Sequence, residues 1–238
     1  MRRLAIVLAL IAIVGLSVSP AAATIVEFSS TNGDVVFNIG TMSMTIQLTN
    51  IGDVTAIGNT LTGVVFTFSA TPPAETLTAG TAPNGTVTCT GSGNSKQDPV
   101  VCAKNNNGPF SVPINGALNA WTLSANLSTD TLQAGGGSFK PYGIVNDSIL
   151  TDGADGLGNS THNPYLLGPV TFTKTFATAA PVDLTVTDVT FNFGTSGATE
   201  HAGLVPEPTT ILLSGTALIL LGYGARKRLF RGRGLTAA

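Results

Sequence analysis

Short runs of alternating apolar and polar residues constrain the fold of this chain more than any other feature. From Val64 to Phe68 every second residue is apolar and suited to one face, and Thr71-Pro72-Pro73 then stops the run. Successive strand side chains point to opposite faces, so such a run predicts a half-buried strand. Gly, Pro and Asn interrupt every candidate helical period between the two ends of the chain. Similar runs occur at residues 35–39, 42–48, 121–123 and 170–176. We therefore predict an all-β fold, an antiparallel β-sandwich with long loops.

The last apolar stretch of this region changes parity. Its apolar residues are Val182, Leu184 and Val186, followed by Val189, Phe191 and Phe193. A straight strand would bury one of these sets and expose the other, so the switch predicts a bulge or a break near residues 187–188. The run at 35–39 is expected to pair with the run at 42–48 across Gly40-Thr41.

The charge distribution excludes nucleic acid as a partner. Only 10% of the residues are charged, against about 25% in a typical globular domain. Residues 24–205 contain four lysines, no arginine and twelve Asp or Glu residues, which gives this stretch a net charge of −8. Phosphate contacts require Lys and Arg, which this stretch largely lacks.

The N-terminus has the three parts of a secretory signal peptide. Arg2 and Arg3 are followed by the uncharged, mostly apolar residues 4–18 and then by Ala21-Ala22-Ala23. We predict cleavage after Ala23, with Ala21 and Ala23 as the small residues that a signal peptidase reads. A Sec-type translocon and a signal peptidase are the partners implied at this end.

The C-terminus has three segments in a fixed order. Val205-Pro206-Glu207-Pro208 precedes the seventeen uncharged residues 209–225, and the basic cluster Arg226, Lys227 and Arg228 follows. As a helix, 209–225 would rise by about 26 Å, close to the thickness of a hydrocarbon core of about 30 Å. The basic cluster should remain in the cytoplasm. The signal peptide places the preceding residues on the other side, so both ends predict one topology.

These segments together resemble the PEP-CTERM sorting tail. The resemblance implies that Pro206, Glu207 and Pro208 are recognised by a membrane-embedded exosortase, which removes the tail. It also implies release or attachment at the surface of a Gram-negative cell that makes exopolysaccharide. Ten residues follow Arg228, where such tails often stop sooner.

We accordingly divide the chain into four parts. They are a signal peptide (1–23), a β-sandwich body (24–193), a flexible tether (194–205) and a sorting tail (206–230) with its transmembrane helix at 209–225. The predicted function is that of an exported cell-surface or extracellular-matrix protein that is sorted and processed by an exosortase. It is expected to be transiently anchored in the inner membrane, and its body is expected to be structural, non-catalytic and without a cofactor.

Cys89 and Cys102 are the only cysteines. An even count in an oxidising compartment predicts a disulfide. The bond would close a loop of fourteen residues and stabilise the fold by about 3 kcal/mol. A redox pair is the alternative, but the Cys-x-x-Cys spacing is absent.

A Gly-rich loop offers oxygen ligands that suit calcium. Asp147, Asp152, Asp155 and Asn159 lie close together in the sequence, and Ca²⁺ accepts six to eight oxygens. The spacing of a calcium-binding loop is missing, so we expect a solvated turn, with Asp152, Asp155 and Asn159 as weak metal candidates.

Two other functions remain as alternatives. An exopolysaccharide- or glycan-binding module, assisted by calcium, predicts Trp121 or Tyr165 exposed beside the Asp152–Asn159 loop. A secreted hydrolase would need a polar cleft around His162 with a carboxylate within hydrogen-bond reach. We expect His162 to form hydrogen bonds within a loop, and we expect Trp121, Tyr142 and Tyr165 to pack in the core or against loops.

Overall fold

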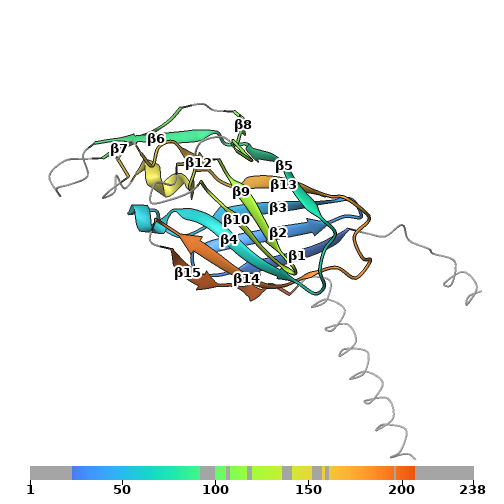
Figure 1. The fold of residues 1–238 in the computed structure, drawn as a ribbon. Helices are drawn as coiled ribbons and strands as arrows, with labels where there is room; N and C mark the ends of the chain where they lie inside the picture. Colours follow the sequence, from blue (N-terminus) through green and yellow to red (C-terminus); the bar gives the residue numbers. More distant parts are fainter. Residues whose placement is uncertain are drawn as a thin grey trace, which may run out of the picture.

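The alternating runs form strands, and the strands form two sheets, in a computed structural model of the chain (Figure 1). The structure describes residues 23–91, 100–105, 108–116, 120–135, 141–151, 157–158, 161–195 and 197–206. Within them the fold is all-β, with two short 3-10 turns, η1 (Ile57–Asn59) and η2 (Asp147–Leu150). The strands are β1 (Thr24–Ser29), β2 (Gly33–Ile39), β3 (Ser43–Asn50), β4 (Leu61–Phe68), β5 (Glu75–Ala82), β6 (Thr86–Thr90), β7 (Val101–Lys104), β8 (Phe110–Ser111), β9 (Thr122–Asn126), β10 (Thr129–Gln133), β11 (Ile144–Val145), β12 (Tyr165–Leu167), β13 (Val170–Phe176), β14 (Val186–Phe193), β15 (Ala198–His201) and β16 (Gly203–Leu204).

The first sheet has seven strands in the order β16-β1-β2-β3-β13-β5-β8, and all its pairs are antiparallel. The predicted β2–β3 hairpin is confirmed, because Ile39 pairs with Met44 and the Gly40 amide donates to the Ser43 carbonyl at 2.8 Å. Strand β13 joins β3 to β5, so a late segment lies inside a sheet built mainly from early ones. This crossover brings distant residues of the sequence together.

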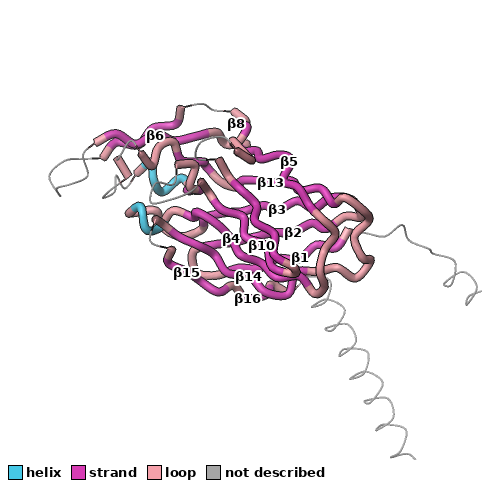
Figure 2. The backbone as a smooth tube through the Cα atoms, viewed as in Figure 1, coloured by secondary structure: helices cyan, strands magenta, loops and turns pink. Residues whose placement is uncertain are grey.

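The second sheet has nine strands. Its main order is β15-β14-β4-β11-β12-β6-β7, and β10 pairs with β4 and with β9. One of its pairs, β11–β12, is parallel. Strands β4, β10 and β14 of this sheet lie over β1, β2 and β3 of the first sheet in Figures 1 and 2, and buried residues of both sheets form one core.

The two sheets face each other across a large apolar core in a sandwich-like arrangement. Phe37 of β2 and Phe66 of β4 bring their ring centroids to 5.0 Å across the core. Glycine at position 33 lets the backbone of β2 approach β14, since a Cβ atom there would lie 2.8 Å from the Phe191 ring. A second, smaller core lies around the disulfide end of β6, where Tyr165, Val145 and Leu157 pack together.

The parity switch near the end of the body produces the predicted bulge. The register between β14 and β4 shifts between Val186 and Asp188, and Val186, Val189 and Phe191 are all buried. The extra residue turns both apolar sets toward the core. Val182 does not take part, because it lies in the preceding loop with 88% of its surface exposed. Met42, which we predicted to be the first residue of its strand, likewise precedes β3 and is 51% exposed.

Residues 194–205, which we expected to form a flexible tether, instead add strands to both sheets. Strand β15 pairs with β14, and β16 pairs with β1. Glu200 of β15 accepts hydrogen bonds from the Ser30 hydroxyl (2.9 Å) and from the Asn32 amide (3.2 Å) and side chain. These bonds join the outer strand of one sheet to the β1–β2 turn of the other. The pairing could not be predicted from the Gly- and Thr-rich composition of this segment, because the backbone hydrogen bonds that form it need no apolar side chains.

Both ends of the described chain lie on the same edge of the first sheet. Strands β1 and β16 are antiparallel neighbours, and the Val205 amide donates to the Glu27 carbonyl at 2.9 Å. Thr24 and Pro206 line one shallow depression. Within the residues described, no helix is long and apolar enough to cross a membrane. The predicted transmembrane helix 209–225 lies outside those residues.

Candidate functional site

The residues predicted for sorting lie at or beyond the ends of the described chain. Ala23 precedes β1 and is exposed, and Pro206 follows β16 and is also exposed. Ala21, Glu207 and Pro208 lie outside the described residues, as do Arg226, Lys227 and Arg228. Their roles stay predictions.

The cysteine prediction is confirmed. Cys89 of β6 and Cys102 of β7 are directly paired across the two strands and form a disulfide. Their Cα atoms lie 4.0 Å apart, and Cys89 is buried in the smaller core. A structural disulfide of this kind is compatible with an oxidising, extracytoplasmic compartment.

Asp152, Asp155 and Asn159, the weak calcium candidates, also lie outside the described residues. Asp147, the fourth member of that group, is exposed and forms an ion pair with Lys104 at 3.2 Å. The part of the chain that the structure describes holds no cluster of three or more His, Cys, Asp or Glu side chains arranged for a metal.

The rings considered for glycan binding are buried. Trp121 and Tyr165 both have 0% of their surface exposed. The Trp121 indole donates to the Tyr142 carbonyl at 3.0 Å, and the Tyr165 hydroxyl donates to the Leu157 carbonyl at 3.1 Å. The exposure that the glycan-binding alternative predicted is therefore wrong for both rings, and core packing is confirmed for them.

The two histidines occupy different settings. His162 is 8% exposed, and burial lowers its pKa. His201 lies on β15, outside the core, with its Nδ1 atom 3.0 Å from the Thr190 hydroxyl. Neither of the two depressions near the chain ends is lined by a histidine.

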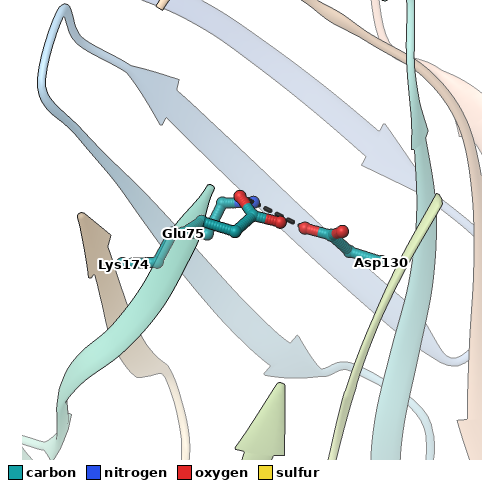
Figure 3. A network of polar contacts seen from close by, with 3 residues as sticks. All are labelled: Glu75, Asp130 and Lys174. Atoms are coloured by element: carbon teal, nitrogen blue, oxygen red, sulfur yellow. Dashed lines mark hydrogen bonds and ion pairs between the residues drawn. The ribbon is translucent and has the colours of Figure 1, made fainter. Parts of the chain in front are cut away.

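The most unusual chemistry of the described residues lies inside the sandwich, where three charged side chains meet. Lys174 projects from β13, Glu75 from β5 and Asp130 from β10 (Figure 3). The Lys174 ammonium donates to Asp130 Oδ2 at 2.6 Å and to Glu75 Oε2. Because β13 and β5 belong to one sheet and β10 to the other, the cluster bridges the two sheets.

Strand geometry explains why these side chains point inward. Lys174 has the same parity as Val170, Phe172 and Phe176, which are all buried on the core face of β13. Asp130 shares a face of β10 with buried Leu132 in the same way. The fold therefore leaves the Lys174 side chain no path to solvent.

Aromatic rings surround the ammonium group and exclude water. Lys174 Nζ lies 4.4 Å from the ring centroid of Phe68, 5.1 Å from that of Phe66 and 5.6 Å from that of Phe176. The side chains of Lys174 and Asp130 are 0% exposed and that of Glu75 is 2% exposed. Ion pairs this dry are uncommon, because desolvation of each charge costs several kcal/mol.

The charges of the cluster do not balance if all three groups are ionised. Burial, and then the neighbouring Asp130 carboxyl, raises the pKa of Glu75 to about 7, although Lys174 opposes the shift. Glu75 Oε1 and Asp130 Oδ1 are buried without a hydrogen-bond partner among the described residues. A proton on Glu75 leaves one cation facing one anion.

Stability should fall as the pH rises through the range in which Glu75 titrates. The pKa is 4.5 for an unperturbed glutamate and about 7 in the folded protein. Between these values the folded state holds a proton that the unfolded state has lost, so the free energy of unfolding decreases with rising pH. The decrease is at most about 3 kcal/mol.

Urea unfolding of the wild type and of Glu75→Gln between pH 4.5 and 7 measures this effect. The glutamine variant lacks the titrating group but keeps the shape of the side chain. We expect the wild type to lose stability relative to the variant as the pH rises. A stability difference that stays constant over this range would contradict the buried, protonated Glu75.

No family model, no curated protein and no solved structure matches this chain.

Proposed function

We propose that the chain is an exported cell-surface or extracellular-matrix protein that an exosortase sorts and processes, with a structural, non-catalytic body. The observation that carries this proposal is the order of the C-terminal segments. Pro206-Glu207-Pro208, an uncharged run and a basic cluster follow one another behind a chain that begins with a secretory signal pattern. The disulfide supports it, because such bonds persist in extracytoplasmic compartments.

The positions of the chain ends also support it. Thr24, the first residue after the expected signal cleavage, and Pro206, the first residue of the sorting motif, line the same depression. The signal peptide and the tail therefore leave the body at one place. A body whose described ends lie together in this way can fold outside the membrane while the segments beyond both ends remain attached.

Buried rings favour a structural role for the body over glycan binding. The large amphipathic rings that would stack on a sugar are used instead to fill the core, as Trp121 and Tyr165 do. No observation on the described residues favours a hydrolase.

Intact mass of the protein recovered from the surface or the medium tests the sorting proposal. In a strain with an exosortase we expect the loss of residues 1–23 and of the segment after about Pro208. In a strain without the exosortase only residues 1–23 should be lost. An intact tail in both strains would make this a membrane-anchored protein and would overturn the proposal.

A matched pair of variants tests whether the exosortase recognises the Pro206-Glu207-Pro208 motif itself. Glu207→Gln should abolish tail removal in the exosortase strain. Asp183→Asn removes an exposed carboxylate elsewhere on the surface and should leave tail removal unchanged.

A further inference from the structure

The buried cluster holds an amine against a carboxyl group at reacting distance. Lys174 Nζ lies 2.6 Å from Asp130 Oδ2. A carboxyl carbon lies about 1.2 Å from its oxygens, which puts Nζ within about 3.8 Å of Asp130 Cγ. Glu75 contacts the same nitrogen. This separation is close to the about 3–3.5 Å of a near-attack arrangement, so a small shift of either side chain brings the reacting atoms together.

We propose that Lys174 and Asp130 condense to form an intramolecular amide cross-link between the two sheets, and that Glu75 is the catalytic acid–base residue. The reaction needs no cofactor and no co-reactant. It goes beyond the proposed sorting function and does not depend on it.

Burial makes the neutral forms of the reactants accessible. An ammonium group is not a nucleophile, and a carboxylate is a poor electrophile. In a dry site, however, separated charges are costly, and transfer of one proton along the Lys174–Asp130 hydrogen bond turns the ion pair into an amine and a carboxylic acid. The rings of Phe66, Phe68 and Phe176 keep out the water that would stabilise the charged pair.

The condensation balances within the cluster. The lone pair of Lys174 Nζ attacks Asp130 Cγ, and the C–N bond forms. Glu75, protonated at the start, delivers its proton to the departing Asp130 oxygen and takes up the proton that this nitrogen loses. The C–O bond then breaks, one water leaves, and Glu75 returns to its protonated state. Its contact with Nζ suits the transfer from the nitrogen, and the Asp130 carboxyl, which contacts the same Nζ, lies beside it for the other.

The fixed geometry lowers the barrier, since effective molarities of well-oriented intramolecular reactions reach about 10⁵–10⁸ M. The surroundings of the cluster favour the product. The product removes a buried ion pair and one carboxyl oxygen. The remaining Asp130 oxygen becomes an amide carbonyl, which needs fewer hydrogen bonds than a buried carboxylate.

The cross-link would join strands that lie far apart in the sequence. Asp130 and Lys174 are separated by 44 positions and belong to opposite sheets. The disulfide, in contrast, joins two adjacent strands of one sheet. The two bonds would therefore restrain different parts of the fold.

Intact mass of the purified full chain tests the proposal. After reduction of the disulfide, the wild type should weigh about 18 Da less than its sequence predicts, because amide formation releases one water. Glu75→Gln should retain the full mass or lose the water far more slowly. Asp130→Asn should lose about 17 Da, because attack on an amide releases ammonia instead.

A tryptic map locates the bond. Trypsin cannot cut after an acylated lysine, and Lys140 is protected by Pro141. The reduced, unfolded wild type should therefore give a peptide that starts at residue 105 and continues uncleaved through Lys174. In Glu75→Gln the same peptide should end at Lys174.

A folded wild-type protein with its full mass and normal cleavage after Lys174 would overturn the proposal. Circular dichroism and the disulfide state show whether each variant is folded. A crystal structure of the wild type tests for the cross-link without any variant, because an amide bond brings Nζ and Cγ to about 1.33 Å. Loss of water at the wild-type rate in a folded Glu75→Gln variant would overturn the role of Glu75. Tail removal changes the mass expected for the whole chain, but it changes neither the loss of about 18 Da nor the missed cleavage after Lys174. The sorting test can therefore fail without affecting this one.

Discussion

Replacing Lys174 with alanine is expected to destabilise the protein by about 3–5 kcal/mol. The substitution leaves the Glu75 and Asp130 carboxyl groups in an apolar core without their cation, and it opens a cavity where the lysine stem lay. Chemical denaturation at constant pH measures the loss. The loss should be larger if the amide cross-link is present, because closing a loop of this length stabilises a fold by about 4 kcal/mol.

Lys104→Ala is the matched control. Lys104 also pairs with an aspartate, Asp147, but this pair is partly exposed to solvent. Exposed pairs contribute about 0–1 kcal/mol, so the control should change stability little. Equal losses for the two variants would contradict the buried cluster.

A third variant separates the charge effect from the loss of packing. Lys174→Met combined with Glu75→Leu and Asp130→Leu replaces the whole cluster with apolar side chains. Buried ionic groups can often be replaced in this way at little cost, so the triple variant should recover much of the stability lost in Lys174→Ala. If the triple variant recovers none of this stability, the interactions within the cluster stabilise the fold by more than the burial of its charges destabilises it.

The alternation of side chains was sufficient to predict much of the fold. The hairpin across Gly40-Thr41 and the bulge near Asp188 both follow from the requirement that the apolar residues of a strand lie on the face toward the core. The order of strands in the sheets could not be predicted in this way. Strand β13 pairs with β3 and β5 through backbone hydrogen bonds, and these carry no sequence signal.

The same alternation contained a signal for Lys174 that we did not use. Its position between Phe172 and Phe176 places it on the buried face of a strand that was correctly predicted. A lysine on such a face requires a buried partner. Its partners could not have been identified from the sequence, because Glu75 and Asp130 lie 99 and 44 positions away and only the strand order brings them together.

Trp121→Ala should be the other strongly destabilising substitution, with a loss of about 3–5 kcal/mol. The ring is fully buried, and its centroid lies 4.7 Å from that of Phe172. Its removal leaves a cavity and takes away the hydrogen bond to the Tyr142 carbonyl. Trp121→Phe keeps most of the packing and should lose less. Val182→Ala, at a position that is 88% exposed, should change stability by less than about 0.5 kcal/mol.

Trp121 also reports on its own environment, because it is the only tryptophan in the chain. A buried indole should emit at short wavelength, resist quenching by acrylamide, and shift to longer wavelength on unfolding. Addition of oligosaccharide should leave the emission unchanged, since no sugar can reach the ring. Strong quenching of the folded protein, together with a small loss of stability in Trp121→Ala, would place the indole at the surface. That combination would favour a glycan-binding face over a structural body, because the proposed structural role rests on rings that fill the core.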